Sequence, residues 1–391
     1  MQTNFPPKQE EQVTLANWRR APYSSWAFHH VSEIVPSAVI KHDPALVSTL
    51  VESTRSIDKL DLSNIISAGD GDSIESFLSA TDTDGLVVLK NGELVYESYP
   101  SVMSADDPHI LMSVSKSMLG LLVGILANEG TLDVESQVTN YIPELIDSGF
   151  AGATVRDLLD MRCGVAFDED YLAITGKIIE YRKATNWNPL NEGELPGDLR
   201  SFFSTLTESS GPHGGDFDYK SPCTDLLGWV IERATGACYA EVFSEKLWSR
   251  VGAEYPAMIT VDRLGAPRVA GGMSMTTRDL ARVGQLVADG GRGIIPESWI
   301  VDIETGGDPG AWSAGNFAEH FVNRSMHYRS KWYVLREQGP ILLCLGIHGQ
   351  DLLIDRRANL VLAKQACAGD ALDNHSTSMT IALFEALRDA L

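Results

Sequence analysis

Residues 113–126 read SVSKSMLGLLVGIL, which places a serine and a lysine in front of a long apolar run. The run predicts a buried helix that begins close to Ser113. Ser113 and Lys116 are three residues apart, so they share one face of the first helical turn. Burial disfavours an ammonium group and lowers a lysine pKa from its usual value of about 10.4. A neutral Lys116 amine could accept the proton of Ser113, which predicts a nucleophilic serine with a lysine base.

The same pattern occurs by chance in long chains, and this chain contains a second example. Residues 56–59 read SIDK, but their surroundings are polar and include Glu52 and Arg55. A lysine there stays solvated and protonated, so we interpret these residues as a turn of a surface helix. The prediction for Ser113 therefore depends on further catalytic groups elsewhere in the chain.

The composition indicates a globular protein and restricts its partners. The chain has 391 residues, of which 44% are hydrophobic, enough for one large domain or two closely packed domains. Its charge is strongly acidic, because 31 Lys and Arg against 53 Asp and Glu give 31 − 53 = −22 at pH 7. Such a chain repels phosphates, so we expect neither nucleic acid nor an anionic membrane as a partner.

Targeting and metal-binding signals are missing from the sequence. The first residues lack the apolar segment of a signal peptide, and no apolar run approaches the roughly 18 residues of a membrane span. Five scattered cysteines without C-x-x-C pairs are typical of reduced thiols, so we expect a cytoplasmic protein. The nine histidines show no ligand spacing and no nucleotide-binding glycine motif occurs, so we expect no metal and no cofactor.

The order of the expected elements indicates an α+β fold. A hairpin is expected around Asn91-Gly92, the dipeptide favoured in type I′ turns, with strands at 86–90 and 93–96. Helical patterns occur at 118–126, 154–161, 224–234, 277–288 and about 376–391, and strand-like runs at 341–345, 351–355 and 359–363. This order predicts an antiparallel sheet flanked by helices, a mostly helical second lobe, and an active site in the cleft between them. We expect residues 1–50 to be an extension packed on a main domain of residues 51–391, with the helical lobe inserted at roughly 130–270.

Tyr219 is the second candidate catalytic residue. It follows Gly214-Gly215 and precedes an amphipathic helical pattern. A tyrosinate held near a lysine can take the serine proton and pass it to the leaving group. The Tyr-x-Ser pattern is weak by itself, because four other tyrosines match it, namely Tyr23, Tyr96, Tyr99 and Tyr328. A packing role for Tyr219 stays open as the alternative.

The third element is the run GIHGQ at residues 346–350, which leads into a strand-like segment. An acyl-transfer site needs backbone N–H donors aimed at the developing oxyanion. A glycine-flanked strand could supply the amide of Ile347 as one donor, with the amide of Ser113 as the other. For His348 we expect a contact with substrate, and a hydrogen-bonded structural histidine is the alternative.

In this order and spacing, the three elements resemble the serine β-lactamase and penicillin-recognising superfamily, in which S-x-x-K, Y-x-N/S and a K-T-G-like strand converge on one cleft. Within it, the chain looks most similar to the 6-aminohexanoate-dimer (nylon oligomer) hydrolases and related carboxylesterases. The likeness spans nearly the whole chain and rests on residues 26–28, 35–37, 111–117, 140–145, 169–171, 278–284 and 346–350. It implies a β-lactamase-like α+β fold.

The resemblance also implies a role for each candidate residue. Ser113 would be the acylated nucleophile, Lys116 its base, and Tyr219 the acid/base near the leaving group. The amides of Ser113 and Ile347 would form the oxyanion hole. From the loop-rich section 163–222, Tyr171 would close over the substrate and hydrogen-bond an amide leaving group, with Trp187 as a gating aromatic beside it. Loop packing is the alternative for both.

Two positions depart from the pattern of the nylon-dimer hydrolases. Arg182 stands where these enzymes have an Asp that holds the ammonium end of the substrate, and Ala270 stands where they tend to have a polar residue. An arginine repels an ammonium and favours an anionic or neutral group. The third motif also lacks the Lys-Thr-Gly with which a dedicated β-lactamase grips a carboxylate.

These features predict a serine hydrolase, foremost a carboxylesterase on short acyl esters, with amidase activity on linear amides of the 6-aminohexanoate type. The alternatives are a D-amino-acid-type peptidase or amidase, a weak β-lactamase, and a catalytically silent relative that binds a peptide-like ligand. The expected partner is a small-molecule ester or amide, and the expected assembly is a monomer or a homodimer.

Overall fold

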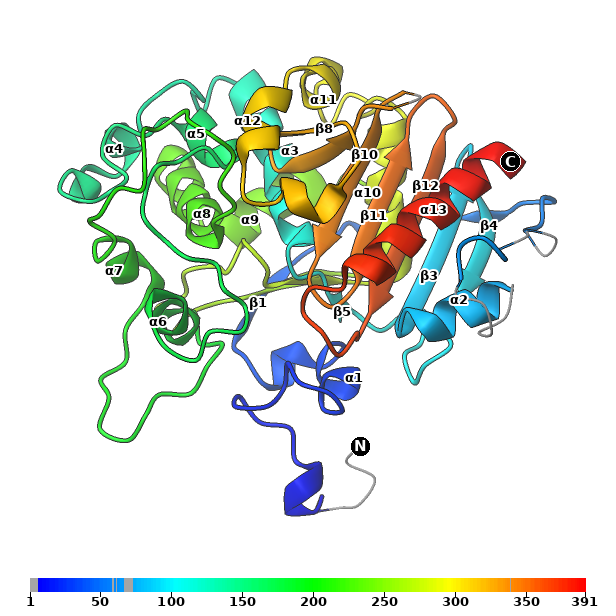
Figure 1. The fold of residues 1–391 in the computed structure, drawn as a ribbon, viewed down its shortest axis with the longest axis horizontal. Helices are drawn as coiled ribbons and strands as arrows, with labels where there is room; N and C mark the ends of the chain where they lie inside the picture. Colours follow the sequence, from blue (N-terminus) through cyan, green and yellow to red (C-terminus); the bar gives the residue numbers. More distant parts are fainter. Residues whose placement is uncertain (1–5, 58–59, 61, 67–72, 338) are drawn as a thin grey trace.

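The computed structural model describes residues 6–57, 60, 62–66, 73–337 and 339–391. In these residues the strands form two sheets (Figure 1). The larger sheet has the order β2 (Val51–Glu52), β4 (Glu93–Ser98), β3 (Thr83–Lys90), β12 (Leu360–Ala366), β11 (Gln350–Asp355), β10 (Ile341–Gly346), β9 (Trp332–Leu335) and β8 (Met326–Arg329). The smaller sheet has the order β1 (Ser37–Ile40), β6 (Ala257–Thr260), β7 (Met273–Met275) and β5 (His109–Ile110). Neighbouring strands are antiparallel except β2 and β4.

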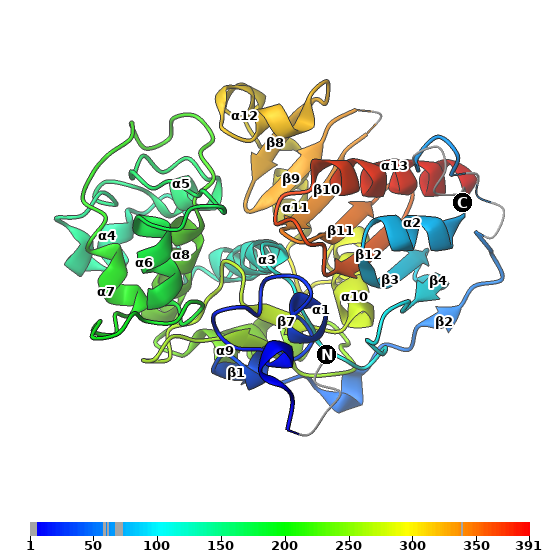
Figure 2. The same cartoon turned by 60° about the horizontal axis from the view of Figure 1, so that its bottom comes forward.

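The helices cover both faces of the larger sheet and fill a region beside it (Figure 2). Along the chain, α1 (Ser24–Ala27) precedes the strands of the larger sheet and α2 (Ile74–Ala80) lies between β2 and β3; between β4 and β8 lie α3 (Val114–Asn128), α4 (Val138–Tyr141), α5 (Val155–Leu159), α6 (Lys177–Ala184), α7 (Leu199–Phe203), α8 (Ser221–Thr235), α9 (Tyr239–Phe243), α10 (Thr277–Ala288), α11 (Glu297–Thr305) and α12 (Pro309–Ala314). The chain ends in α13 (Asn374–Ala390). Helices α2 and α13 lie on one face of the sheet and α10 on the other, while α4 to α8 gather beside it (Figure 2). The domain boundaries expected from the sequence stay predictions.

Local sequence patterns explain the hairpin and several helix ends. Strands β3 and β4 pair with Lys90 opposite Glu93, and Asn91 and Gly92 both have positive φ, as a type I′ turn requires. The predicted hairpin is therefore confirmed. Thr154 caps α5 in a capping box with Asp157, and Gly236 ends α8 in the left-handed conformation.

Helix α3 is apolar all round because it is buried on every side. It contacts β10 and β11 of the larger sheet and α8 of the helical region. Its two glycines allow close packing, since a Cβ on Gly120 would lie 2.1 Å from the carbonyl oxygen of Ser330, and one on Gly124 would lie 2.4 Å from the Trp299 ring. The N-terminal end of α3, with Ser113 directly before it, therefore lies between the larger sheet and the helical region.

Two local expectations differ from the structure. Residues 55–57 form no helix and the Ile57 side chain is buried, whereas Lys59 lies outside the described residues. The loop-rich section 163–222 contains α6 and α7, and α7 begins where the Asp198 side chain accepts a hydrogen bond from the Ser201 amide. In the described residues no helix is long and apolar enough to cross a membrane.

Candidate active site

Ser113 lies at the N-terminal end of α3, and its hydroxyl does not cap the helix. It occupies the N-cap position, but its side chain makes no capping hydrogen bond. The preceding Met112 has a φ of 45°, a left-handed conformation that a residue other than glycine rarely adopts. Strain of this kind persists only where the surroundings enforce it, and it marks sites where a side chain must be held in one place.

Lys116 is buried and directly contacts the serine. Its Nζ lies 2.8 Å from the Oγ of Ser113 and donates to the carbonyl oxygen of Ala270 at 2.7 Å. Burial lowers the pKa of Lys116 to about 7, and the positive charge of Arg268 contributes in the same direction while Glu169 opposes it. About half of the lysine is therefore neutral at pH 7. A neutral amine can keep its bond to Ala270 and accept the proton of Ser113.

A buried ionic cluster holds the carbonyl that orients Lys116. The Oδ1 atom of Asp225, on α8, accepts a hydrogen bond from the Ala270 amide at 2.7 Å. The Oδ2 atom of Asp225 pairs with the guanidinium of Arg268 and with the hydroxyl of Tyr181. This cluster fixes the backbone at Ala270, and Ala270 in turn fixes the lysine.

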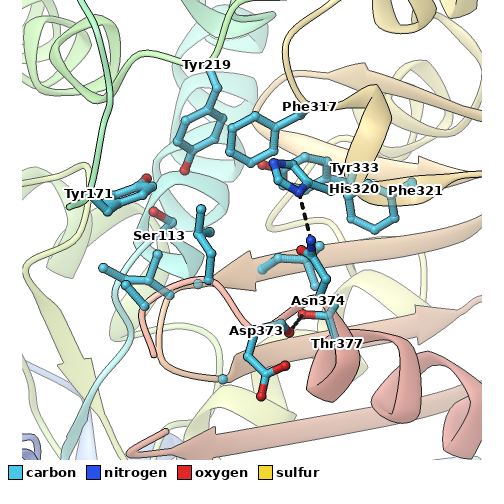
Figure 3. A pocket seen from close by; sticks show the side chains of 16 residues that line it. Ser113, Tyr171, Tyr219, Phe317, His320, Phe321, Tyr333, Asp373, Asn374 and Thr377 are labelled. Atoms are coloured by element: carbon cyan, nitrogen blue, oxygen red, sulfur yellow. Dashed lines mark hydrogen bonds between the residues drawn. The ribbon is translucent and has the colours of Figure 1, made fainter. Parts of the chain in front are cut away.

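Tyr219 reaches the same serine from the segment before α8. The Nζ of Lys116 lies 4.9 Å from the centre of its ring, and its phenol lies near the Ser113 side chain and Tyr333. Figure 3 shows the phenol and the serine facing each other across the site. Burial raises the pKa of Tyr219, and the negative charge of Glu169 adds to the effect. This environment favours a protonated phenol, a proton donor, over the tyrosinate considered from the sequence.

The end of β10 lies against the start of α3, next to the Ser113 amide. A Cβ on Gly346 would lie 2.7 Å from the Leu111 carbonyl oxygen and 3.1 Å from the Ser113 amide nitrogen, so only glycine fits here. Ile347 follows directly. In the described part of the chain, neither the Ser113 nor the Ile347 amide donates a hydrogen bond to a backbone carbonyl of a turn, loop or cap. The arrangement suits the predicted oxyanion hole, which stays a prediction.

Two hollows adjoin Ser113, and Ser113, Tyr171 and Ile347 line both. The first contains about 620 Å³ of empty space and is also lined by Tyr219, Phe317, His320, Phe321, Tyr333, Leu345, Gly346, Gly349, Ala371, Leu372, Asp373, Asn374 and Thr377 (Figure 3). The second contains about 420 Å³ and is also lined by Arg19, Met112, Glu169, Ile178, Tyr181, Arg182, Trp187, Ser221, Arg268, Ala270 and Gly271.

The structure brings most of the predicted residues together at these hollows. Arg182, Trp187 and Ala270 line the second hollow, and Tyr171 lies between the two. The Trp187 ring is buried, and its Nε1 donates to the Thr260 hydroxyl at 3.1 Å. These are contacts expected of a loop packing residue, which was the alternative role for Trp187.

His348 differs from the expectation that it contacts substrate. Its side chain is not among those that line either hollow. The ring is buried against Phe28, and its Nδ1 bonds to the carbonyl oxygen of Ala368 at 2.7 Å. Burial lowers the pKa of His348 to about 4, so the ring is neutral at pH 7. These contacts are those of the structural alternative.

Sequence reasoning missed several residues of the site. Arg19, Arg268 and Asp225 surround or support the second hollow, while Phe317 and Tyr333 line the first. They come from segments far apart in the chain, and none lies in a motif. The described residues contain no group of three or more His, Cys, Asp or Glu side chains that could hold a metal ion.

Comparisons with known proteins agree with the geometry. A family model described as Beta-lactamase matches residues 74–363. The chain is 34% identical to a 6-aminohexanoate-dimer hydrolase of Paenarthrobacter ureafaciens over 95% of this chain and 92% of that one. It is 26% identical to Esterase EstB of Burkholderia gladioli, but over 38% of this chain and 40% of the relative.

A solved structure shows the same architecture. The protein, from Bacillus anthracis and assigned as a 6-aminohexanoate-dimer hydrolase, superimposes with a TM-score of 0.86 at 26% identity. The match covers 98% of this chain and 99% of the other. The predicted β-lactamase-like α+β fold is thereby confirmed.

Proposed function

The chain belongs to the beta-lactamase family and is a serine hydrolase at the level of that family; we propose that it acts through an acyl-enzyme on Ser113, foremost as a carboxylesterase on short acyl esters. The observation that carries this proposal is the 2.8 Å contact between the Ser113 hydroxyl and a buried Lys116 whose pKa lies at about 7. A serine needs such a base to become nucleophilic at neutral pH.

The first half of the reaction forms the acyl-enzyme. Neutral Lys116 takes the proton of Ser113, and the serine Oγ attacks the carbonyl carbon of the substrate. The amides of Ser113 and Ile347 donate hydrogen bonds to the carbonyl oxygen as negative charge develops on it. Tyr219, kept protonated by burial, donates a proton to the leaving oxygen or nitrogen as its bond to carbon breaks. In the second half, water gives a proton to the Tyr219 phenolate and attacks the acyl carbon, and the Lys116 ammonium returns its proton to the Ser113 oxygen as the acyl bond breaks.

Esters come first because an alkoxide leaves with less proton donation than an amine does. Linear amides of the 6-aminohexanoate type are the second candidate activity, and Tyr171 favours them. Tyr171 lines both hollows and its phenol lies near Glu169, beside Ser113, where the scissile bond would lie. The peptidase, β-lactamase and ligand-binding alternatives are separated from these two by assaying amides against matched esters.

The direct test is hydrolysis of 4-nitrophenyl acetate and butyrate by the wild type and by Ser113→Ala. We expect the substitution to lower kcat/KM by about 10³-fold or more, because the nucleophile is lost. Ser115→Ala is the matched control, since Ser115 lies on the same helix and its hydroxyl only accepts from the Met273 amide at 3.2 Å. Wild-type turnover in Ser113→Ala would overturn the proposal.

A further inference from the structure

The second hollow collects arginines from three separate parts of the chain. Arg19 comes from the N-terminal segment, Arg182 from α6, and Arg268 from the loop before β7. Burial, together with like-charge repulsion from Arg182 and Arg268, lowers the pKa of Arg19 to about 9. Arg19 therefore stays charged at pH 7 in a place where positive charges crowd one another.

Carboxylates lie near these arginines, and the negative charges of Glu169 and Asp170 act on Arg182. Arg268 pairs with Asp225. Glu169 is engaged by Ser221, accepting from its amide at 2.8 Å and from its hydroxyl at 2.5 Å. Within the described chain no carboxylate oxygen lies within 4.0 Å of the guanidinium of Arg19 or Arg182. Among the residues that line this hollow, three are arginines and one, Glu169, is a carboxylate, on a chain whose net charge is −22.

Neutral groups hold the two unpaired arginines in place. Arg19 donates to the Asn188 side chain at 2.5 Å, and its guanidinium lies over the rings of Trp18 and Trp187 at 5.5 and 5.7 Å. Arg182 donates to the carbonyl oxygen of Tyr171 at 3.2 Å. The Nε of Arg19 is buried without a hydrogen-bond partner among the described residues. Fixed guanidinium groups with free charge suit a planar carboxylate, which two parallel N–H groups can bind.

The position of Tyr219 decides which end of the substrate meets these arginines. Tyr219 lines the first hollow and not the second. As the proton donor to the leaving group, it directs that group into the first hollow, so the acyl group extends into the second. This step depends on the proposed function.

We propose that the second hollow is a carboxylate-binding site for the far end of the acyl group, formed by Arg19 and Arg182. The preferred substrates are then half-esters or half-amides of short dicarboxylic acids. In the ester case the bond from Ser113 Oγ to the acyl carbon forms and the ester C–O bond breaks, with the proton leaving on the alcohol. Water then releases the acid, so half-ester and water give dicarboxylate, alcohol and one proton.

The test compares two esters that differ only at the end of the acyl chain, the 4-nitrophenyl half-ester of glutaric acid and 4-nitrophenyl pentanoate. We expect the wild type to favour the half-ester by about tenfold or more in kcat/KM, the discrimination that a charge-assisted pair can provide. Arg19→Gln and Arg182→Gln should each lower this ratio about five- to tenfold. Lys183→Gln is the control, because Lys183 adjoins Arg182 on α6 but pairs with Glu194 at 2.6 Å and leaves the ratio unchanged.

A second measurement keeps the proposal testable if one of the two glutamine variants fails to fold. Free glutarate should inhibit pentanoate hydrolysis competitively in the wild type, and less so in whichever of the two glutamine variants folds. A wild-type ratio near one, or a ratio unchanged in both variants, overturns the carboxylate site. Neither result touches the proposed function, which fails only if pentanoate hydrolysis survives Ser113→Ala.

Discussion

The two hollows beside Ser113 share Ser113, Tyr171 and Ile347 but differ in the other residues that form their walls. Aromatic rings dominate the first, contributed by Phe317, by η6 (Ala318–Phe321) and by β9. Arginines dominate the second, and they stand on the N-terminal segment, α6 and the loop before β7. The reacting groups, by contrast, lie at the ends of long buried elements, α3, α8 and β10. Rigid elements thus position the chemistry, and the surrounding segments select the substrate.

Tyr219→Phe gives the largest effect that separates the two hollows. Because Tyr219 lines the first hollow only, its loss should depend on the leaving group and not on the acyl group. We expect kcat/KM for an ethyl ester to fall about 10²–10³-fold, the range for losing a general acid. For a 4-nitrophenyl ester the fall should be much smaller, because that phenolate leaves without a proton.

Tyr328→Phe is the control for this change. Tyr328 is also a buried phenol followed two residues later by a serine, but it packs on β8 and lines neither hollow. We expect nearly wild-type rates for both esters. Equal losses with both leaving groups in Tyr219→Phe would contradict the role of Tyr219 as a proton donor.

A smaller effect is expected in the pH profile. Lys116 acts as a base only when neutral, and its pKa is about 7, so kcat/KM should rise about tenfold per pH unit up to pH 7 and level off above it. Lys116 lines neither hollow, so kcat/KM, which reports on the free enzyme, should show this pH profile with both the half-ester and the pentanoate ester. A carboxylate bound in the second hollow favours the ammonium form, so the pKa seen in kcat should be higher for the half-ester. Rates measured from pH 5.5 to 9 test both statements, and a flat profile would exclude Lys116 as the base.

Elements with a strong local pattern could be predicted from the sequence. The hairpin around Asn91-Gly92, the helices α3, α5, α8, α10 and α13, and the strands β10 to β12 were all expected. Each has either a sustained apolar period or a turn residue that only one conformation accommodates. The Ser113–Lys116 pair was predictable for the same reason, because a spacing of three residues places two side chains on the same face of a helical turn.

The walls of the hollows could not be predicted in this way. Arg19 meets Arg182 and Arg268 only because the N-terminal segment packs on Trp187, a contact between residues more than 160 positions apart. The pairing of Arg268 with Asp225 is also long-range. The environment of Tyr219 depends on burial by Phe317 and Tyr333, which no pattern around Tyr219 indicates. Tertiary packing, and not local sequence, sets both the charge of one hollow and the proton state of the phenol.

The most direct test of the central claim is the mass of the protein quenched during turnover. With a substrate whose acyl group is released slowly, such as the glutaric acid half-ester at low pH, the intact chain should gain the mass of one acyl group. Peptide mapping should place that mass on the peptide containing Ser113, and Ser113→Ala should show no adduct. An adduct on another residue, or rapid turnover with no adduct at Ser113 under any quench, would contradict the account.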